Sequence, residues 1–227
     1  MFSSRAPEPA AVAPPEIGPL LAAELAVEYS SLRAPSNCPA GMYLMPSSET
    51  LLRWAGVFFV HRGPYAGSIL RFTLSFPPAY PRARPSVHFD SDVFHPLVDP
   101  KTREWIPRGR LAQWQPHVDH VPHLLHALKA SFKTVALDAV TEHEAVNRQV
   151  WSMYHHSPQT FLSLTAQRAR HSATRQTLYD DPDPHARVPA ATTSTEAHSG
   201  KVIQFTELDD GAVGRLWADM RRSLGEH

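Results

Sequence analysis

The chain has 227 residues, which is enough for one full domain with extensions or for two very small domains. Its 22 Lys and Arg residues balance its 22 Asp and Glu residues, so the net charge gives no electrostatic footprint for nucleic acid or an anionic membrane. The single cysteine, Cys38, excludes an intramolecular disulfide framework and a cysteine-based zinc site, and it indicates a reducing compartment.

The N-terminal residues 1–15 are rich in Ala and Pro, and no apolar period emerges in them, so we expect a disordered tail. Prolines also stand where a signal peptide would need a continuous apolar run. No later segment approaches the ~20 apolar residues of a membrane span. We therefore expect a cytoplasmic protein with no direct membrane insertion.

The first predicted element is a helix that starts near Pro19. Leu21, Leu25, Tyr29 and Leu32 follow one another at helical offsets and form one apolar face of about four turns. Residues 41–91 then read as strands separated by turn signals. The clearest strand alternates two sets of side chains: apolar Leu70, Phe72, Leu74 and Phe76, and more polar Arg71, Thr73 and Ser75. This alternation predicts an antiparallel meander of four short strands.

Helical periods return after a long loop. The first apolar stripe consists of Val121, Leu124, Leu125, Leu128, Phe132 and Val135, and Pro122 is acceptable in the first turn. Further helices are expected around Val150, with Val146, Trp151 and Tyr154, and from Pro158 onwards. The order of elements predicts an α+β domain over residues 16–172, with an N-terminal helix, a four-stranded antiparallel meander and C-terminal helices.

The C-terminal region is expected to contain a flexible linker and one more helix. Residues 173–202 are too polar to bury a core. Residues 203–227 predict an amphipathic helix whose apolar face consists of Val213, Leu216, Trp217, Met220 and Leu224. This face either folds back onto the domain or docks in a groove of a partner protein, and the sequence leaves both alternatives open.

A set of residues, in this order, resembles the ubiquitin-conjugating fold over residues 17–172. The set consists of Trp54 in the second strand, Gly63, Pro64, Tyr65 and Gly67 at a hairpin, Phe76, Pro77, Tyr80, Pro81 and Pro85 after the next strand, Phe94, His95 and Pro96 in the loop, and Trp114 and Pro116 before a helix. The resemblance implies that His95, Pro96, Trp114 and Pro116 are structural residues.

The reactive residues of that family are missing. The family pattern places an oxyanion-stabilising Asn after His-Pro, where this chain has Leu97, and a thioester-forming Cys about eight residues later, near Trp105. Loss of one oxyanion donor typically lowers a rate ~10²–10³-fold. Residues 103–111 contain no Cys and no hydroxyl residue, and Cys38 is expected before the first strand. The sequence therefore resembles a ubiquitin-conjugating enzyme variant without catalytic activity, and the loop is expected to serve the architecture.

The run from Val93 to Pro100 resembles the Fused Toes or Akt-interacting protein group of these variants. This resemblance implies an adaptor that binds a Hook-type coiled-coil protein and a Fused Toes–Hook-interacting protein (FHIP)-like protein, and that links early endosomes to dynein on microtubules. The alternative is a variant that assists an active conjugating enzyme or binds ubiquitin non-covalently. A conjugating enzyme that uses Cys38 is the third hypothesis.

Two other patterns have simpler explanations than chemistry. Four histidines recur every three residues: His117, His120, His123 and His126. Pro122 interrupts their register, so solvated or capping histidines are expected here rather than a metal site. Glu142 and Glu144 flank His143, and we interpret them as acidic residues in the first turn of a helix. We expect no metal, no cofactor and no nucleic-acid partner.

Overall fold

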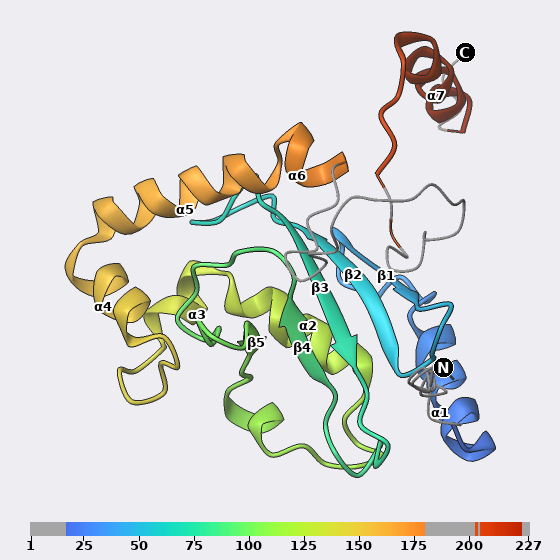
Figure 1. Cartoon of the computed structure of the whole chain (residues 1–227), viewed down its shortest axis with the longest axis horizontal. Coiled ribbons are helices and arrows are strands. Elements are labelled where there is room, and N and C mark those ends of the chain that lie inside the picture. The colour runs from blue at the N-terminus through green and yellow to red at the C-terminus, as the bar shows by residue number, and fades with distance from the viewer. Residues whose placement is uncertain (1–16, 180–202, 204, 224–227) are drawn as a thin grey trace, which may run out of the picture.

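The computed structural model describes residues 17–179, 203 and 205–223 (Figure 1). The expected α+β order is confirmed, with one helix before the sheet and the other helices after it. The elements are α1 (Pro19–Ser31), β1 (Met42–Pro46), β2 (Arg53–Phe59), β3 (Ile69–Ser75), β4 (Ser86–Phe89), β5 (Glu104–Trp105), a 3₁₀ turn (Gly109–Ala112), α2 (Val121–Ser131), α3 (Thr134–Asp138), α4 (Arg148–His156), α5 (Pro158–Ser172), α6 (Arg175–Tyr179) and α7 (Asp210–Ser223).

The sheet is an antiparallel meander of five strands in the order β1-β2-β3-β4-β5. The expectation of four strands was wrong by one, because β5 is only two residues long and lies inside the predicted loop. Val87 of β4 pairs with Trp105, and His88 pairs with Glu104. So short a strand has no alternating pattern of its own, and it exists only because the loop folds back onto β4.

The inner face of the sheet and helix α2 form the core. β3 alternates as predicted, with Phe72 and Leu74 fully buried and their neighbours half-buried. Gly56 of β2 lies beneath the Phe72 ring, where a Cβ atom would come within 2.3 Å of that ring. On the helix side, Leu124, Leu125 and Leu128 of α2 are buried, as the apolar stripe predicted.

The predicted stripe of α2 extends too far at its C-terminal end. The helix stops at Ser131, and Phe132 is still buried as its C-cap residue. Val135 lies in the separate short helix α3 and is 81% exposed. The helical period breaks at the turn between α2 and α3, so Val135 no longer shares the face of the buried residues.

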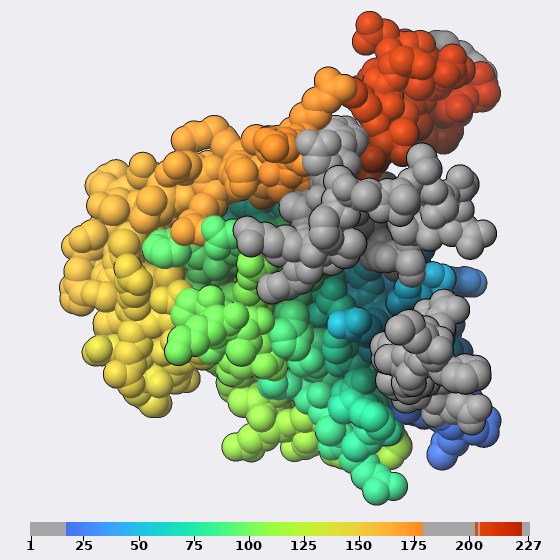
Figure 2. All heavy atoms as spheres, in the orientation of Figure 1, coloured from blue at the N-terminus to red at the C-terminus, as the bar shows by residue number. Residues whose placement is uncertain are grey.

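The C-terminal part departs from a simple linker and helix. Helix α6 occupies the start of the predicted linker, and residues 180–202 lie outside the described part of the chain, as does the predicted tail of residues 1–15. Helix α7 begins only at Asp210, and none of its residues is buried. Figures 1 and 2 show α7 projecting beyond the sheet and the other helices. Among the described residues, no helix has the length and apolar character needed to cross a bilayer.

Candidate functional site

His95 of the catalytic-like loop is a buried structural residue. Its imidazole is 0% exposed and packs against the rings of Tyr65 and Phe132 at centroid distances of 5.5 and 4.6 Å. Its Nε2 lies 3.0 Å from the carbonyl oxygen of Ser131, and its Nδ1 lies 3.0 Å from the backbone nitrogen of Leu97. An N–H donor at Leu97 and a carbonyl acceptor at Ser131 together fix the neutral tautomer with its proton on Nε2. These two contacts join His95 to the end of α2 and to its own loop.

Burial also determines the charge of this histidine. It lowers the pKa of His95 from 6.5 to about 4, although the hydrogen bond to the Ser131 carbonyl favours the charged form. The ring is therefore uncharged at neutral pH, and both of its nitrogens form hydrogen bonds with the backbone. A histidine in this state has no free nitrogen with which to transfer a proton.

The two positions that carry chemistry in the family pattern face the protein interior. Leu97 is 3% exposed and Trp105 is 2% exposed, and both belong to the hydrophobic core. The carbonyl of Leu97 accepts a hydrogen bond from the Ile106 N–H at 2.9 Å, and Val98 forms a bridge with Trp105. A reacting thioester would need an accessible nucleophile here. The structure instead places a buried indole in a paired strand.

The segment between those two positions is a closed hairpin. Asp99 Oδ1 accepts hydrogen bonds from the backbone N–H groups of Lys101 at 2.7 Å and Thr102 at 2.9 Å. These bonds, Thr102 first, lower the pKa of the Asp99 carboxyl. Arg103 takes the left-handed conformation with φ of 60°, and the Asp99 N–H donates to the Glu104 carbonyl. Local side-chain bonds of this kind favour a tight turn, so Asp99 holds the loop against β4.

A second segment closes the outer side of the loop. The Asn147 N–H donates to the Pro96 carbonyl at 2.9 Å. Arg108 donates to the Ala139 carbonyl at 2.7 Å and to Glu144 Oε2 at 2.6 Å. Bonds from Thr141, and then from Arg108, lower the pKa of Glu144 to about 2. The helix-dipole interpretation of Glu144 was wrong, because residues 141–145 form a turn before α4 and the carboxylate caps that turn.

Cys38 lies outside the catalytic-like loop. It lies between α1 and β1, as expected, and its Sγ is 3.4 Å from the Met42 carbonyl oxygen. Burial raises the pKa of the Cys38 thiol, and the charge of Lys129 opposes this rise only in part. Since the thiolate is the reactive form, a raised pKa disfavours nucleophilic chemistry at this cysteine.

The remaining motif residues hold the region before α2. The indole N–H of Trp114 donates to the Pro81 carbonyl at 2.8 Å, and its ring packs near Tyr80, so Trp114 joins this segment to the β3–β4 connection. Pro116 is exposed. In this segment the four spaced histidines form no metal site with the other described residues. His120 caps α2, and Nδ1 of His123 accepts from the His120 N–H, so the capping interpretation is confirmed for this pair.

Sequence reasoning missed the buried carboxylate Glu28. It lies on α1 and is 4% exposed. It accepts hydrogen bonds from the Tyr80 hydroxyl at 2.6 Å and the Val121 N–H at 3.1 Å, and its Oε1 is 2.7 Å from Nδ1 of His120. Glu28 therefore ties α1 to the start of α2 and to the β3–β4 connection. Its place on the inner face of α1, three residues after buried Leu25, was the available signal.

The candidate partner-binding residues of α7 form an exposed apolar face. Leu216 is 52% exposed, Trp217 58% and Met220 46%, whereas Val213 is half-buried and Leu224 lies outside the described residues. The segment before α7 is anchored to the sheet, because the Phe205 ring lies 6.3 Å from that of Phe59 and beneath the Arg71 guanidinium. The anchor holds the segment, while the apolar face of the helix stays open.

Comparisons with known proteins identify the family. A sequence profile described as ubiquitin-conjugating enzyme matches residues 24–169. The chain is 36% identical over 115 residues to a crossbronx-like protein of Drosophila grimshawi, covering 50% of this chain and 51% of that protein. It is 29% identical over 161 residues to the crossbronx homolog of Anopheles gambiae, covering 70% and 69%. It is 31% identical over 150 residues to the AKT-interacting protein of Danio rerio, covering 64% and 49%.

The chain thus spans about half the length of two of these relatives and about two thirds of the third. The matched profile includes the sheet, the closed loop and helices α2 to α4. Since this profile covers more than half of the sequence, the chain belongs to the ubiquitin-conjugating enzyme family, in the group of variants related to AKT-interacting protein and crossbronx.

Proposed function

We propose that this chain is a non-catalytic adaptor built on the ubiquitin-conjugating fold. The observation that carries the proposal is the burial of Leu97 and Trp105 at the positions of the oxyanion donor and the nucleophile. The closed hairpin around Asp99 and the two engaged nitrogens of His95 support it, because they give the loop a structural role. Surfaces for protein partners are then the remaining means of action.

The proposed assembly contains a Hook-type coiled-coil protein and an FHIP-like protein, and it links early endosomes to dynein for transport along microtubules. The relationship to AKT-interacting protein supports this choice, through the resemblance to the Fused Toes group. The protein would act in the cytoplasm and reach vesicles through its partners. The exposed face of α7, with Leu216 and Trp217, is the proposed contact with the coiled coil, because an amphipathic helix fits an apolar groove along its length.

The catalytic part of the proposal predicts that the chain forms no thioester. We expect no reducible ubiquitin adduct on a non-reducing gel after incubation with ubiquitin-activating enzyme, ATP and ubiquitin. The reason is that Cys38 is the only cysteine and its thiol pKa is raised. An active conjugating enzyme serves as the positive control. An adduct that disappears in Cys38→Ser would overturn the proposal and support an unconventional enzyme.

The adaptor part predicts that α7 contributes to partner binding. We expect Leu216→Ala/Trp217→Ala to weaken binding to a purified Hook-type coiled-coil protein about 30-fold or more, since buried aromatic residues dominate interfaces. The measurement is the dissociation constant by fluorescence anisotropy, together with co-elution of the three-protein complex. Leu20→Ala/Val135→Ala is the matched control, because both residues are apolar and more than 80% exposed elsewhere on the domain.

The outcomes separate the two classes of binding protein. If neither the native chain nor the control binds the Hook-type protein, the assembly is wrong. If the native chain instead retains ubiquitin or an active conjugating enzyme in the same assay, the chain is the alternative variant that supports conjugation. Equal binding by the α7 variant and the native chain would show that the partner binds at another surface and not at this helix.

A further inference from the structure

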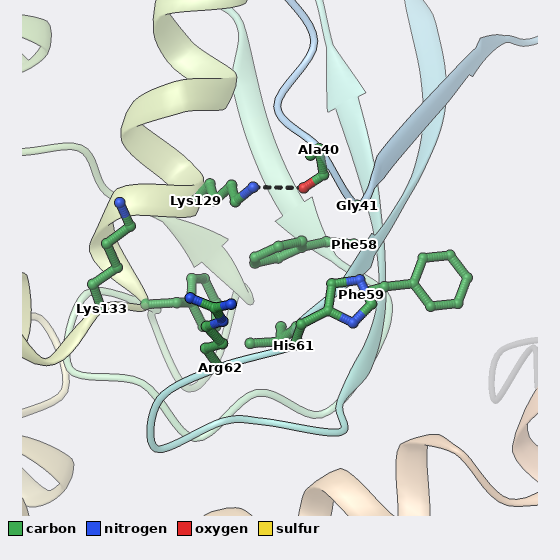
Figure 3. Close-up of a pocket in the computed structure, with 10 residues that line it drawn as sticks. Ala40, Gly41, Phe58, Phe59, His61, Arg62, Lys129 and Lys133 are labelled. Carbon is green, nitrogen blue, oxygen red and sulfur yellow. Dashed lines mark hydrogen bonds between the residues drawn. The ribbon is translucent and has the colours of Figure 1, made fainter.

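A hollow of about 560 Å³ opens between the end of α2 and the end of β2 (Figure 3). Its floor is apolar and consists of Phe58, Val60 and Phe132, which are all buried. The rings of Phe58 and Phe132 meet edge to face at a centroid distance of 5.5 Å. No residue of the closed loop 94–105 lines this hollow, so it is distinct from the site described above.

The rim of the hollow carries basic side chains from two directions. His61 and Arg62 follow β2, whereas Lys129 lies in the last turn of α2 and Lys133 follows that helix (Figure 3). No carboxylate is among the described residues that line the hollow. An apolar floor inside a basic rim is selective for a ligand that combines an apolar group with negative charge.

These charges are largely available for a ligand. Lys129 Nζ donates to the Ala40 carbonyl at 2.5 Å, which uses one of its three N–H groups. Arg62 and Lys133 are exposed, and neither forms an ion pair with a carboxylate in the described part of the chain. Among the described residues, no carboxylate is paired with Arg62 or Lys133 of the basic rim, although the whole chain has a formal net charge of zero.

The backbone between Ala40 and β1 contributes to the shape of the hollow. Gly41 has φ of +84°, and a Cβ atom there would lie 2.9 Å from the Phe59 carbonyl oxygen. A glycine is needed for this close approach to β2, and it leaves the space beside His61 free of a side chain. The wall on this side is thus formed by backbone that is held in place by the sheet.

We propose that this hollow binds an acidic peptide segment of a protein partner, with an aromatic or aliphatic side chain of the segment on the apolar floor. The volume lies in the range of pockets for drug-sized ligands, which leaves room for a large side chain with its neighbours, and the rings of Phe58 and Phe132 offer the edge and face contacts that aromatic groups prefer. Carboxylates beside the inserted side chain would meet Arg62 and Lys133 of the basic rim.

The observations favour a peptide over other anionic partners. A nucleic acid is recognised by an extended basic surface, whereas here four basic side chains surround one apolar hollow. A flat anionic membrane would meet the exposed ends of Arg62 and Lys133 but would leave the recessed floor unfilled. The proposal holds whether or not the partner is a Hook-type protein, so it goes beyond the adaptor role.

The test is a titration of the full ¹⁵N-labelled chain with the synthetic peptide acetyl-Glu-Asp-Phe-Glu-Asp-Leu-amide, followed by NMR. We expect shift changes that cluster at Gly41, Val60, His61 and Lys133. Two further peptides separate the contributions: one with Gln and Asn in place of the acids, and one with Ala in place of Phe and Leu. Each is expected to bind at least about tenfold more weakly, since one peptide lacks the acidic side chains and the other lacks the apolar ones.

Two charge-reversal variants locate the binding. Arg62→Glu/Lys133→Glu should abolish the shifts, because it makes the rim acidic. Lys101→Glu/Arg148→Glu should leave them unchanged: it reverses the same number of exposed charges, and neither residue lines the hollow. Both pairs lie on the surface, and a far-ultraviolet circular dichroism spectrum checks their folding.

Three results would overturn the proposal. The first is the absence of clustered shifts at millimolar peptide, and the second is equal binding by the two charge-reversed variants. The third is a native chain that binds phosphatidylserine vesicles but not the peptide, together with loss of vesicle binding in the Arg62→Glu/Lys133→Glu variant. That last result would assign the basic rim to a lipid surface.

Discussion

Replacing Glu28 by Ala is expected to lower the free energy of unfolding by about 3 kcal/mol, because it removes the shared acceptor of a buried network. The carboxylate is 4% exposed and serves the Tyr80 hydroxyl, the Val121 N–H and the His120 imidazole. Without it, the Tyr80 hydroxyl and the Val121 N–H lose the acceptor that they have inside the protein. Burial, and then the bond to Glu28, raise the pKa of Tyr80, so its hydroxyl stays a donor.

The measurement is the midpoint and slope of urea unfolding, with three companion variants. Glu28→Gln should lower the free energy of unfolding less than Glu28→Ala does, since the amide keeps one oxygen acceptor. Tyr80→Phe, combined with Glu28→Ala in a double-mutant cycle, isolates the bond between the two residues, because each single change removes it. Glu142→Ala is the control, because this glutamate is exposed. Equal stability of Glu28→Ala and Glu142→Ala would show that the network contributes nothing to folding.

The predictions that succeeded depend on long periodic segments. β3 alternates over seven residues, and its burial follows that alternation residue by residue. The apolar stripe of α2 likewise predicted the buried Leu124, Leu125 and Leu128. In both segments the same side chains that set the period also form the core, so local pattern and tertiary packing agree.

The errors fall where tertiary contacts decide the local structure. β5 has two residues and forms because Asp99 turns the loop back onto β4, and no period of the sequence announces such a strand. Val135 continues the helical count of α2, yet the chain turns after Ser131 and exposes it. Glu28 is polar, so a search for apolar periodicity passes over it, although it is as buried as its neighbours in the core.

The sequence shows which residue types stand at the two positions of the candidate site, but it does not show how their side chains are arranged. The sequence shows Leu97 at the position of the oxyanion donor and no cysteine near Trp105, the position of the nucleophile. That both side chains are buried, and that Arg108 and Asn147 close the outer side of the loop, required the structure. A loop that is closed from both sides supports the proposed non-catalytic role.

The second large effect is expected from pH, through His95. Its pKa is about 4 in the folded protein and close to the ordinary 6.5 when the chain unfolds. Between these values the unfolded chain binds the proton and the folded chain does not. The stabilisation is therefore complete above pH 6.5 and is lost as the pH falls to 4. The size of the loss is about 3 kcal/mol.

Guanidinium unfolding at several pH values between 7 and 4 measures this effect against His95→Gln. Glutamine has a donor and an acceptor but does not titrate, so the stability advantage of the native chain should shrink by about 3 kcal/mol over this range. His171→Gln is the control, because it replaces a histidine that is exposed on α5 and lies outside the catalytic-like loop. Parallel curves for the native chain and His95→Gln would show that His95 titrates freely. The neutral imidazole with its two backbone hydrogen bonds would then no longer explain why the loop contains this histidine.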